Sequence, residues 1–352
     1  MAAPSSSCIQ PRSPVDWTFP RRATAGDPPR SPAILTVAAC TLLLLQGGPA
    51  VPSRADTEAR GPAVDSMFVL RSANQGEDFL APMGIAIDRA HREIVVANTG
   101  RHRVEFFDLD AYPLGWFTAQ VPGPDGRLVD GTPRNVAVDT EGNILVTDLQ
   151  VPWVAVVDYR GRPITRLALP APDDTADGQH GAGALAVAPD GAILVASRGE
   201  QGRIHVFDRD YRYVSTWGTP GRAPGQLATA TAIAFAPRGE VVVTCYATDL
   251  AVQVFDLSGN YLRGFGVHDI GPGNFSLPSG VTVTADGRIW VLDALRENVQ
   301  VFDSSGSLLG VVGGGGSNPG EFKTPSALAS DGSGLLAVTE QSGRRLQLLW
   351  VR

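Results

Sequence analysis

The 352-residue chain is short of several kinds of residue, and each shortage excludes a class of protein. Lys323 is the only lysine and no run of basic residues occurs, so the basic stripe typical of nucleic-acid-binding proteins is missing. The three cysteines, Cys8, Cys40 and Cys245, lie too far apart in the chain to form the CxxC pairs of a zinc site. We therefore expect neither a nucleic-acid partner nor a cysteine-ligated metal.

Helical periodicity and the common catalytic motifs are missing as well. No window repeats apolar residues at the helical period of 3.6, so we expect almost no helix. The sequence contains neither Gly-x-Ser-x-Gly nor His-Glu-x-x-His. The glycine run 313–316 lacks the Gly-Lys-Ser/Thr ending of a phosphate-binding loop. No local motif identifies an enzyme class.

The longest uncharged apolar run is residues 33–45, which is 13 residues. That length suits a signal peptide and falls short of the roughly 20 residues of a membrane-spanning helix. Small residues follow at 53–55, where a signal peptidase would cut. We predict a leader over 1–55, a linker over 56–65 and a secreted or periplasmic protein. The alternative is a chain anchored in the membrane by an uncleaved segment 33–45.

The rest of the chain is an internal repeat. The segment Pro-Met-Gly-Ile-Ala-Ile-Asp (82–88) is the first of six similar copies, at intervals of 47 to 51 residues. The equivalent positions are 84, 135, 184, 232, 280 and 327. Repeats of roughly 40–50 residues with strand signals are typical of β-propeller blades. We therefore predict one repeat domain over 66–352.

Each copy contains signals for four short strands. In the fifth copy, Ala285-Asp286-Gly287 predicts a tight turn after the first strand, because such residues accept the backbone angles of a hairpin. The apolar segment 289–291 is the second strand, and 299–303, Val-Gln-Val-Phe-Asp, is the third. A fourth strand and a Gly/Pro-rich linker follow. The pattern predicts an all-β fold, a six-bladed propeller of four-stranded antiparallel blades.

The sequence also predicts how the ring closes. The sixth copy ends the chain at 346–350, its third strand, and has no fourth. Residues 66–71 form an orphan strand signal ahead of the first copy. Pairing these two segments completes the last blade and removes a free sheet edge. Because a closed propeller has no free edge to pair with another copy, we expect a monomer.

Two segments of the first copy carry a family resemblance. They are Gly-Ile-Ala-Ile-Asp (84–88) and Val-Ala-Asn-Thr-Gly-Arg-His-Arg-Val (96–104), and the Gly-Gln-Leu of the linker at 225–227 is also typical. The chain resembles the NHL-repeat family over residues 66–352. The resemblance implies the six-bladed propeller fold and leaves function open, because one propeller fold hosts many activities.

One position, directly after the second strand of each copy, is polar in most copies. Four of the six residues there offer oxygen ligands, and they are Asn98, Asp148, Asp293 and Glu340. A hard cation such as Ca²⁺ prefers oxygen ligands of this kind. The other interpretation is local, with each side chain bonded to the loop that follows it. Ser197 and Cys245 at the remaining positions favour the local role.

His180 is the only histidine placed directly before a predicted innermost strand, near the mouth of the central channel. It is a candidate ligand or general base, with an ordinary loop residue as the alternative. The main functional hypothesis is a non-catalytic, extracytoplasmic interaction scaffold that binds a protein or glycan on one face and needs no cofactor. The alternative is a metal-dependent (Ca²⁺ or Zn²⁺) hydrolase or lyase, of the lactonase or peptidyl-amidating-lyase type, with its site at the central channel.

Overall fold

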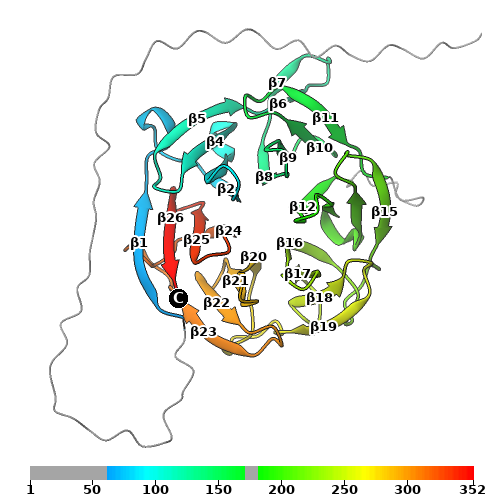
Figure 1. The fold of residues 1–352 in the computed structure, drawn as a ribbon, viewed down its shortest axis with the longest axis vertical. Coiled ribbons are helices and arrows are strands. Elements are labelled where there is room, and N and C mark those ends of the chain that lie inside the picture. The colour runs from blue at the N-terminus through cyan, green and yellow to red at the C-terminus, as the bar shows by residue number, and fades with distance from the viewer. Residues whose placement is uncertain (1–61, 171–180) are drawn as a thin grey trace, which may run out of the picture. The chain divides into compact units, whose positions relative to one another are not determined.

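The computed structural model describes residues 62–170 and 181–352. The predicted leader with its apolar run 33–45, and also His180, lie outside these ranges. Six four-stranded antiparallel sheets stand as blades around a central axis (Figure 1), which confirms the predicted fold class. The described residues contain no helix beyond three short 3-10 turns, at Asn74–Gly76, Thr99–Arg101 and Gly199–Gln201.

In each of the first three blades the strands follow one another from the axis outward. Blade 1 has β2 (Pro82–Asp88), β3 (Glu93–Asn98), β4 (Arg103–Asp108) and β5 (Pro113–Thr118). Blade 2 has β8 (Pro133–Val138), β9 (Ile144–Asp148), β10 (Val154–Val157) and β11 (Pro163–Leu167). Blade 3 has β12 (Ala182–Val187), β13 (Ile193–Ser197), β14 (Ile204–Phe207) and β15 (Tyr213–Trp217).

The last three blades have the same order, and only the sixth takes a strand from elsewhere. Blade 4 has β16 (Thr229–Phe235), β17 (Glu240–Tyr246), β18 (Val252–Asp256) and β19 (Tyr261–Phe265). Blade 5 has β20 (Pro278–Val283), β21 (Ile289–Asp293), β22 (Asn298–Phe302) and β23 (Leu308–Val312). Blade 6 has β24 (Pro325–Ser330), β25 (Leu335–Glu340), β26 (Arg345–Val351) and β1 (Val64–Leu70).

Burial follows the position of a strand within its blade. The second strands β21 and β25 are buried at every residue, which explains why they appear in the sequence as continuous apolar runs. The outermost strand β11 is exposed at four of its five residues. Neighbouring blades pack face to face, as where Val254 of blade 4 shares a core with Val291 of blade 5. The hydrophobic core therefore lies between the blades and encircles the axis.

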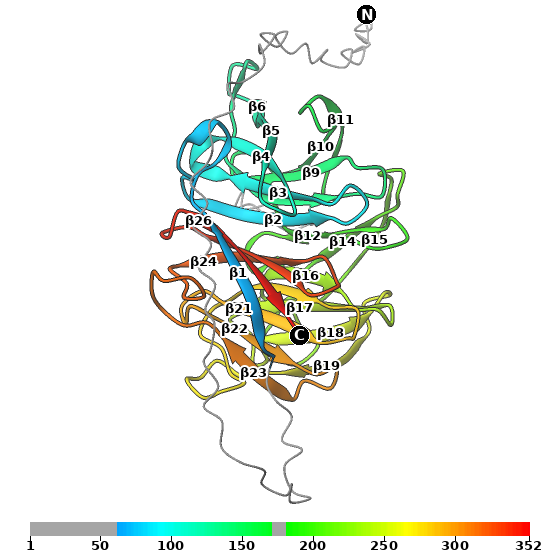
Figure 2. The same ribbon diagram turned by 60° about the vertical axis from the view of Figure 1, so that its left-hand side comes forward.

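The ring closes as predicted. Strand β1 pairs antiparallel with β26, and the partners include Phe68 with Leu348 and Leu70 with Leu346. Figure 2 shows β1 running along β26, so the two ends of the described chain share one blade. Blade 6 is also joined to blade 1 at the axis, where the Thr339 hydroxyl donates to the carbonyl of Met83 at 2.8 Å.

A short hairpin between blades 1 and 2 was not predicted. It consists of β6 (Gln120–Pro122) and β7 (Leu128–Asp130), joined by a turn that contains Gly126. The sequence signal was Pro-Asp-Gly at 124–126, together with the longest of the repeat intervals. No helix in the described ranges is long and apolar enough to span a membrane.

Candidate functional site

Topology places two kinds of connection on the same face of the propeller. Strands alternate in direction within a blade, so the loop from second to third strand and the linker into the next blade lie at the same end. We call this end the linker face. Its loops between second and third strands are 99–102, 149–153, 198–203, 247–251, 294–297 and 341–344. All four predicted oxygen ligands lie at the end of a second strand, at this face.

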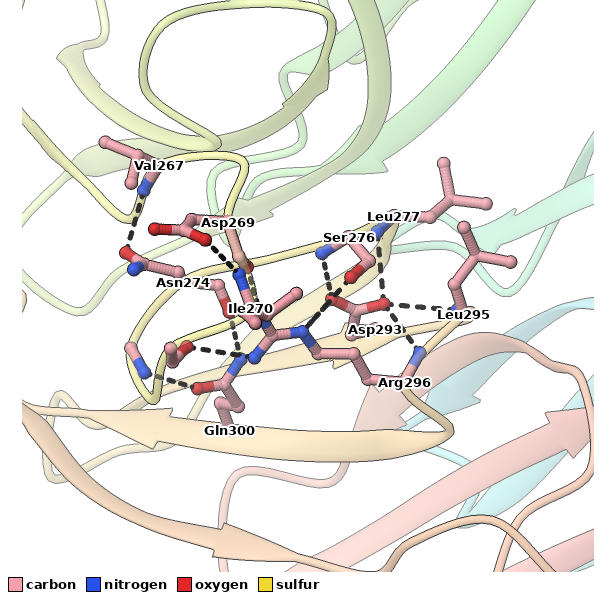
Figure 3. Close-up of polar contacts among 12 residues, drawn as sticks. Val267, Asp269, Ile270, Asn274, Ser276, Leu277, Asp293, Leu295, Arg296 and Gln300 are labelled. Carbon is pink, nitrogen blue, oxygen red and sulfur yellow. Dashed lines mark hydrogen bonds and ion pairs between the residues drawn. The ribbon is translucent and has the colours of Figure 1, made fainter.

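Asp293 is the best connected of the four and is completely buried. Its carboxylate accepts hydrogen bonds from the backbone N–H of Ser276 at 2.6 Å and of Leu277 at 3.1 Å, both in the linker that enters blade 5. It also accepts from the N–H of Leu295 at 3.1 Å and of Arg296 at 3.0 Å, in the loop after β21 (Figure 3). These four bonds use both carboxylate oxygens within one blade and its linker.

The Arg296 side chain extends the same network (Figure 3). Its Nη1 donates to the carbonyl of Gly271 at 3.0 Å, its Nε donates to the Ser276 hydroxyl at 3.2 Å, and its Nη2 donates to the carbonyl of Asp269. The guanidinium thus holds the linker 266–277 against the loop after β21. An arginine with its donors committed to carbonyls and a hydroxyl in this way has a structural role.

Asn98 and Glu340 are also buried and bonded within their own blades. Asn98 Oδ1 accepts from the N–H of Leu80 at 2.9 Å, and its Nδ2 donates to Glu105 at 2.7 Å. Glu340 accepts from the N–H of Lys323 at 2.7 Å and from the Arg345 Nε at 2.6 Å. Each therefore holds the linker that leads into its own blade.

Asp148 is the exception among the four. Its Oδ1 accepts from the N–H of Gln150 at 2.8 Å. Its Oδ2 is buried and has no hydrogen-bond partner among the described residues. Burial raises the pKa of this carboxyl, although its bonds to backbone N–H groups and the charge of Arg198 oppose the rise.

The two blades without an acid or amide at this position use it differently. Ser197 hydrogen-bonds His205 of the neighbouring strand, with 2.9 Å between Oγ and Nε2. Cys245 is fully buried, and burial raises the pKa of its thiol to about 12, which leaves it protonated and unreactive. The equivalent positions thus serve each blade separately.

The four oxygen ligands do not assemble into one metal site. They lie in different blades, and three of them are fully committed to neighbouring groups. Within residues 62–170 and 181–352, no group of three or more His, Cys, Asp or Glu side chains is placed to hold a metal ion. Asn98, Asp148, Asp293 and Glu340 therefore do not form the cation site that the sequence left open.

A second recurrent position, in the middle of the third strand, was missed from the sequence. Gln300 accepts from the N–H of Gly273 at 2.9 Å and donates to the carbonyl of Asn274 at 2.7 Å. Gln253 and Gln347 hold the linkers of blades 4 and 6 with the same pair of bonds. The signal was a glutamine at the same place in the third strands of blades 4, 5 and 6, as in Val-Gln-Val-Phe-Asp at 252–256 and 299–303.

The innermost strands surround a cavity of about 80 Å³ on the axis. Its lining comes from all six blades and consists of small or aliphatic residues with a few hydroxyls and one amide. They are Gly84, Ile85, Asn135, Val136, Ala184, Leu185, Thr231, Ala232, Ile233, Ser279, Gly280, Val281, Ala327 and Leu328. Pockets for organic ligands usually measure roughly 300–1,000 Å³. The cavity therefore has room for a few water molecules, and an organic ligand would have to bind at its mouth.

At the mouth, every innermost strand begins with a change in register. In β8 the change lies between Pro133 and Asn135, which leaves Arg134 outside the regular pairing. A bulge of this kind redirects a side chain, and such bulges are frequent beside functional sites. The residues at the equivalent position around the mouth are Met83, Arg134, Gly183, Thr231, Ser279 and Ser326.

Comparison with known proteins identifies the fold alone. No protein-family model and no curated protein matches the sequence. Among solved structures, the chain is similar to XC5397 from Xanthomonas campestris, a gluconolactonase, with a TM-score of 0.55, 20% identity, and coverage of 87% of this chain and 99% of that one. It is also similar to virginiamycin B lyase from Staphylococcus aureus, with a TM-score of 0.54, 14% identity, and coverage of 81% and 99%.

A third similar structure carries no enzyme name. The β-propeller domain of Cps50 (Swd1) from Myceliophteria thermophila has a TM-score of 0.54 and 14% identity, with coverage of 82% of this chain and 92% of that one. At these identities the likeness establishes a β-propeller and does not extend to activity. The comparisons do not confirm the resemblance to the NHL-repeat family, which stays a prediction.

Proposed function

We propose that this protein is an enzyme of the hydrolase or lyase type that binds an organic substrate at the mouth of its central channel. The observation that carries the proposal is the similarity to a gluconolactonase and to a virginiamycin B lyase, over 87% and 81% of the chain. Both similar proteins are covered over 99% of their own length, so the shared fold is the complete propeller.

The geometry of the channel supports the linker-face mouth as the binding site. The axial cavity itself is too small for an organic molecule. At the mouth, the register change of β8 leaves Arg134 outside the regular pairing and exposed. The substrate is expected to lie over the ring of residues that contains Arg134 and Thr231.

The proposal does not include a calcium ion at the four predicted oxygen ligands. Asn98, Asp293 and Glu340 hold linkers through buried hydrogen bonds. Asp148 is buried in blade 2, and the other three residues lie in blades 1, 5 and 6. Since removing these bonds would free the linkers, the same side chains are not available to bind an ion. We further propose that the protein acts outside the cytoplasm, on the basis of the predicted leader 1–55.

An interaction scaffold for a protein or glycan is the second candidate, and exposed apolar residues on the linker face favour it. Ile270 is 89% exposed, Leu295 is 69% exposed and Tyr246 is 47% exposed. All three belong to blades 4 and 5 or to the linker between them. Exposed apolar side chains that gather on one face are typical of partner-binding surfaces.

A substrate screen separates the two candidates. The purified full chain is incubated with γ- and δ-lactones, aryl esters and a cyclic depsipeptide lactone, with and without chelator. Turnover that saturates with substrate and decreases in Arg134→Gln supports the enzyme. The opposite result is no turnover, together with a binding partner whose capture is abolished by Ile270→Ser and by Leu295→Ser. That result would contradict the enzymatic function and support the interaction scaffold.

A further inference from the structure

The junction between blades 2 and 3 brings two arginines to the channel mouth. Arg134 is exposed and lies at the register change of β8. Its neighbour Asn135 donates through Nδ2 to the carbonyl of Gly183 at 3.0 Å, which ties β8 to the innermost strand of blade 3. The start of β8 also lies beside the loop after β9, because the N–H of Leu149 donates to the carbonyl of Thr132, two residues before Arg134, at 3.1 Å.

Arg198 reaches the same junction from blade 3. It follows β13, and its side chain crosses to blade 2, where Nη1 donates to the carbonyl of Leu149 at 3.1 Å and Nη2 donates to the carbonyl of Val151 at 3.5 Å. Gly181 makes room for it, because a Cβ at that residue would lie 1.9 Å from Nη2. The guanidinium is thus held in place before any ligand arrives.

The two guanidinium groups have no carboxylate partner in the part of the chain that the structure describes. Neither forms an ion pair within 4.0 Å in residues 62–170 and 181–352. Although Arg134 as a whole is exposed, partial desolvation at the mouth and, to a smaller extent, the charge of Arg198 lower its pKa. The charge of Arg198 acts on the buried carboxyl of Asp148, but the two side chains do not form an ion pair within 4.0 Å. An anion at the mouth would relieve the repulsion.

We propose that Arg134 and Arg198 form a subsite that binds an anionic oxygen group of the ligand, namely a carboxylate. The inference rests on the proposed function, because it specifies a chemical feature of the molecule bound at the mouth. A guanidinium has five N–H donors in a planar fork that matches a carboxylate. Arg198 uses two donors on carbonyls, and Arg134 uses none within the described ranges. Donors from two blades therefore remain for one anionic group.

Calorimetry on the full chain at low ionic strength tests the subsite. The probes are malonate, its neutral isostere malonamide, and inorganic phosphate, which shares the anionic oxygens and lacks the carboxylate plane. We expect malonate to bind, malonamide not to bind, phosphate to bind more weakly, and added NaCl to weaken malonate binding. Tighter binding of phosphate than of malonate would overturn the assignment to a carboxylate.

Matched variants locate the binding. Arg134→Gln and Arg198→Gln should each weaken malonate binding by about tenfold or more, the effect of losing a charged hydrogen bond. Arg127→Gln removes the same charge from the hairpin β6–β7, where its side chain is 87% exposed, and should leave affinity unchanged. Thermal melts verify that the variants fold. Equal loss in all three variants, or no loss in Arg134→Gln, would overturn the subsite.

The outcome also separates this inference from the proposed function. Malonate binding that depends on both arginines, without turnover of any lactone or ester, would support the subsite and contradict the proposed enzymatic function. Turnover that malonate does not inhibit, and that Arg198→Gln leaves intact, would support the proposed enzymatic function and contradict the subsite.

Discussion

The carboxylate of Asp293 accepts a 2.6 Å hydrogen bond from the backbone N–H of Ser276, and this bond joins blade 5 to the linker that enters it. The same carboxylate holds the loop on its other side through the N–H groups of Leu295 and Arg296. A residue type that suggests a cation ligand in the sequence thus acts as a buried acceptor for backbone donors. This relationship determines what is expected when the residue is changed or when metals are removed.

Replacing Asp293 should destabilise the protein strongly. Asp293→Ala leaves four backbone N–H groups without the buried carboxylate that accepts from them. Losses of buried charged hydrogen bonds of this kind cost about 3 kcal/mol or more. Urea unfolding should show the lower free energy of unfolding. Asp269→Ala is the control, because that residue is exposed in the same linker and should change stability by less than about 0.5 kcal/mol.

Removal of metal ions should leave the protein unchanged. Three of the four oxygen ligands are saturated by protein donors, so no ion is needed to satisfy them. The melting temperature of the full chain should be the same within about 1 °C with and without chelator, because only a ligand that binds the native state raises it. Elemental analysis gives the companion readout. One tightly held ion per chain whose loss lowers the melting temperature would contradict this prediction.

The fold could be predicted from the sequence because each blade repeats the same local signals. The six segments equivalent to 82–88 became innermost strands, and the turn at 285–287 joined two strands as its Asp-Gly pair indicated. The closing strand was also predictable, since the sixth copy lacked one strand and residues 66–71 supplied it. Periodicity determines which face of a strand is buried, and the repeat supplies six consistent observations of it.

The candidate site was less predictable, because function depends on which polar atoms remain unpaired. Asn98 and Asp293 look like ligands in the sequence, and only the structure shows that backbone donors already occupy them. Arg134 and Arg198 are 64 positions apart and belong to different repeats, so no local pattern relates them. Their proximity comes from the register change in β8 and from the side chain that crosses between blades.

Closure of the ring should contribute much of the stability. A chain that begins at Ser72 lacks β1, which exposes the backbone edge of β26 and the buried side chains Leu346 and Leu348. A loss of several kcal/mol should lower the melting temperature by roughly 10 °C and promote aggregation through the free edge. A chain that lacks only residues 1–55 is the control and should melt like the full chain. An added peptide of residues 62–71 should restore part of the loss.

His205 should make stability depend on pH. It occupies the third-strand position that holds glutamine in three other blades, and burial together with the charge of Arg203 lowers its pKa to about 4. The imidazole lies between the hydroxyls of Ser197 and Thr216, at 2.9 and 2.8 Å. Below the ordinary pKa of 6.5, His205 is protonated in the unfolded chain but stays neutral in the native state. The free energy of unfolding should therefore decrease as the pH falls from about 6.5 toward 4, by at most about 3 kcal/mol.

The variant His205→Gln tests this pH dependence with a side chain that the repeat already accommodates. It should remove the decrease, so that the unfolding free energies of variant and native protein converge or cross as the pH is lowered. His91→Gln is the control at an exposed histidine. The bond to Asp88 raises the pKa of His91, so protonation of this side chain stabilises the native state, whereas protonation of His205 destabilises it. Urea titrations at pH 7.5, 6 and 4.5 supply the measurement. Parallel profiles for the native protein and His205→Gln would show that the buried imidazole does not control the acid sensitivity.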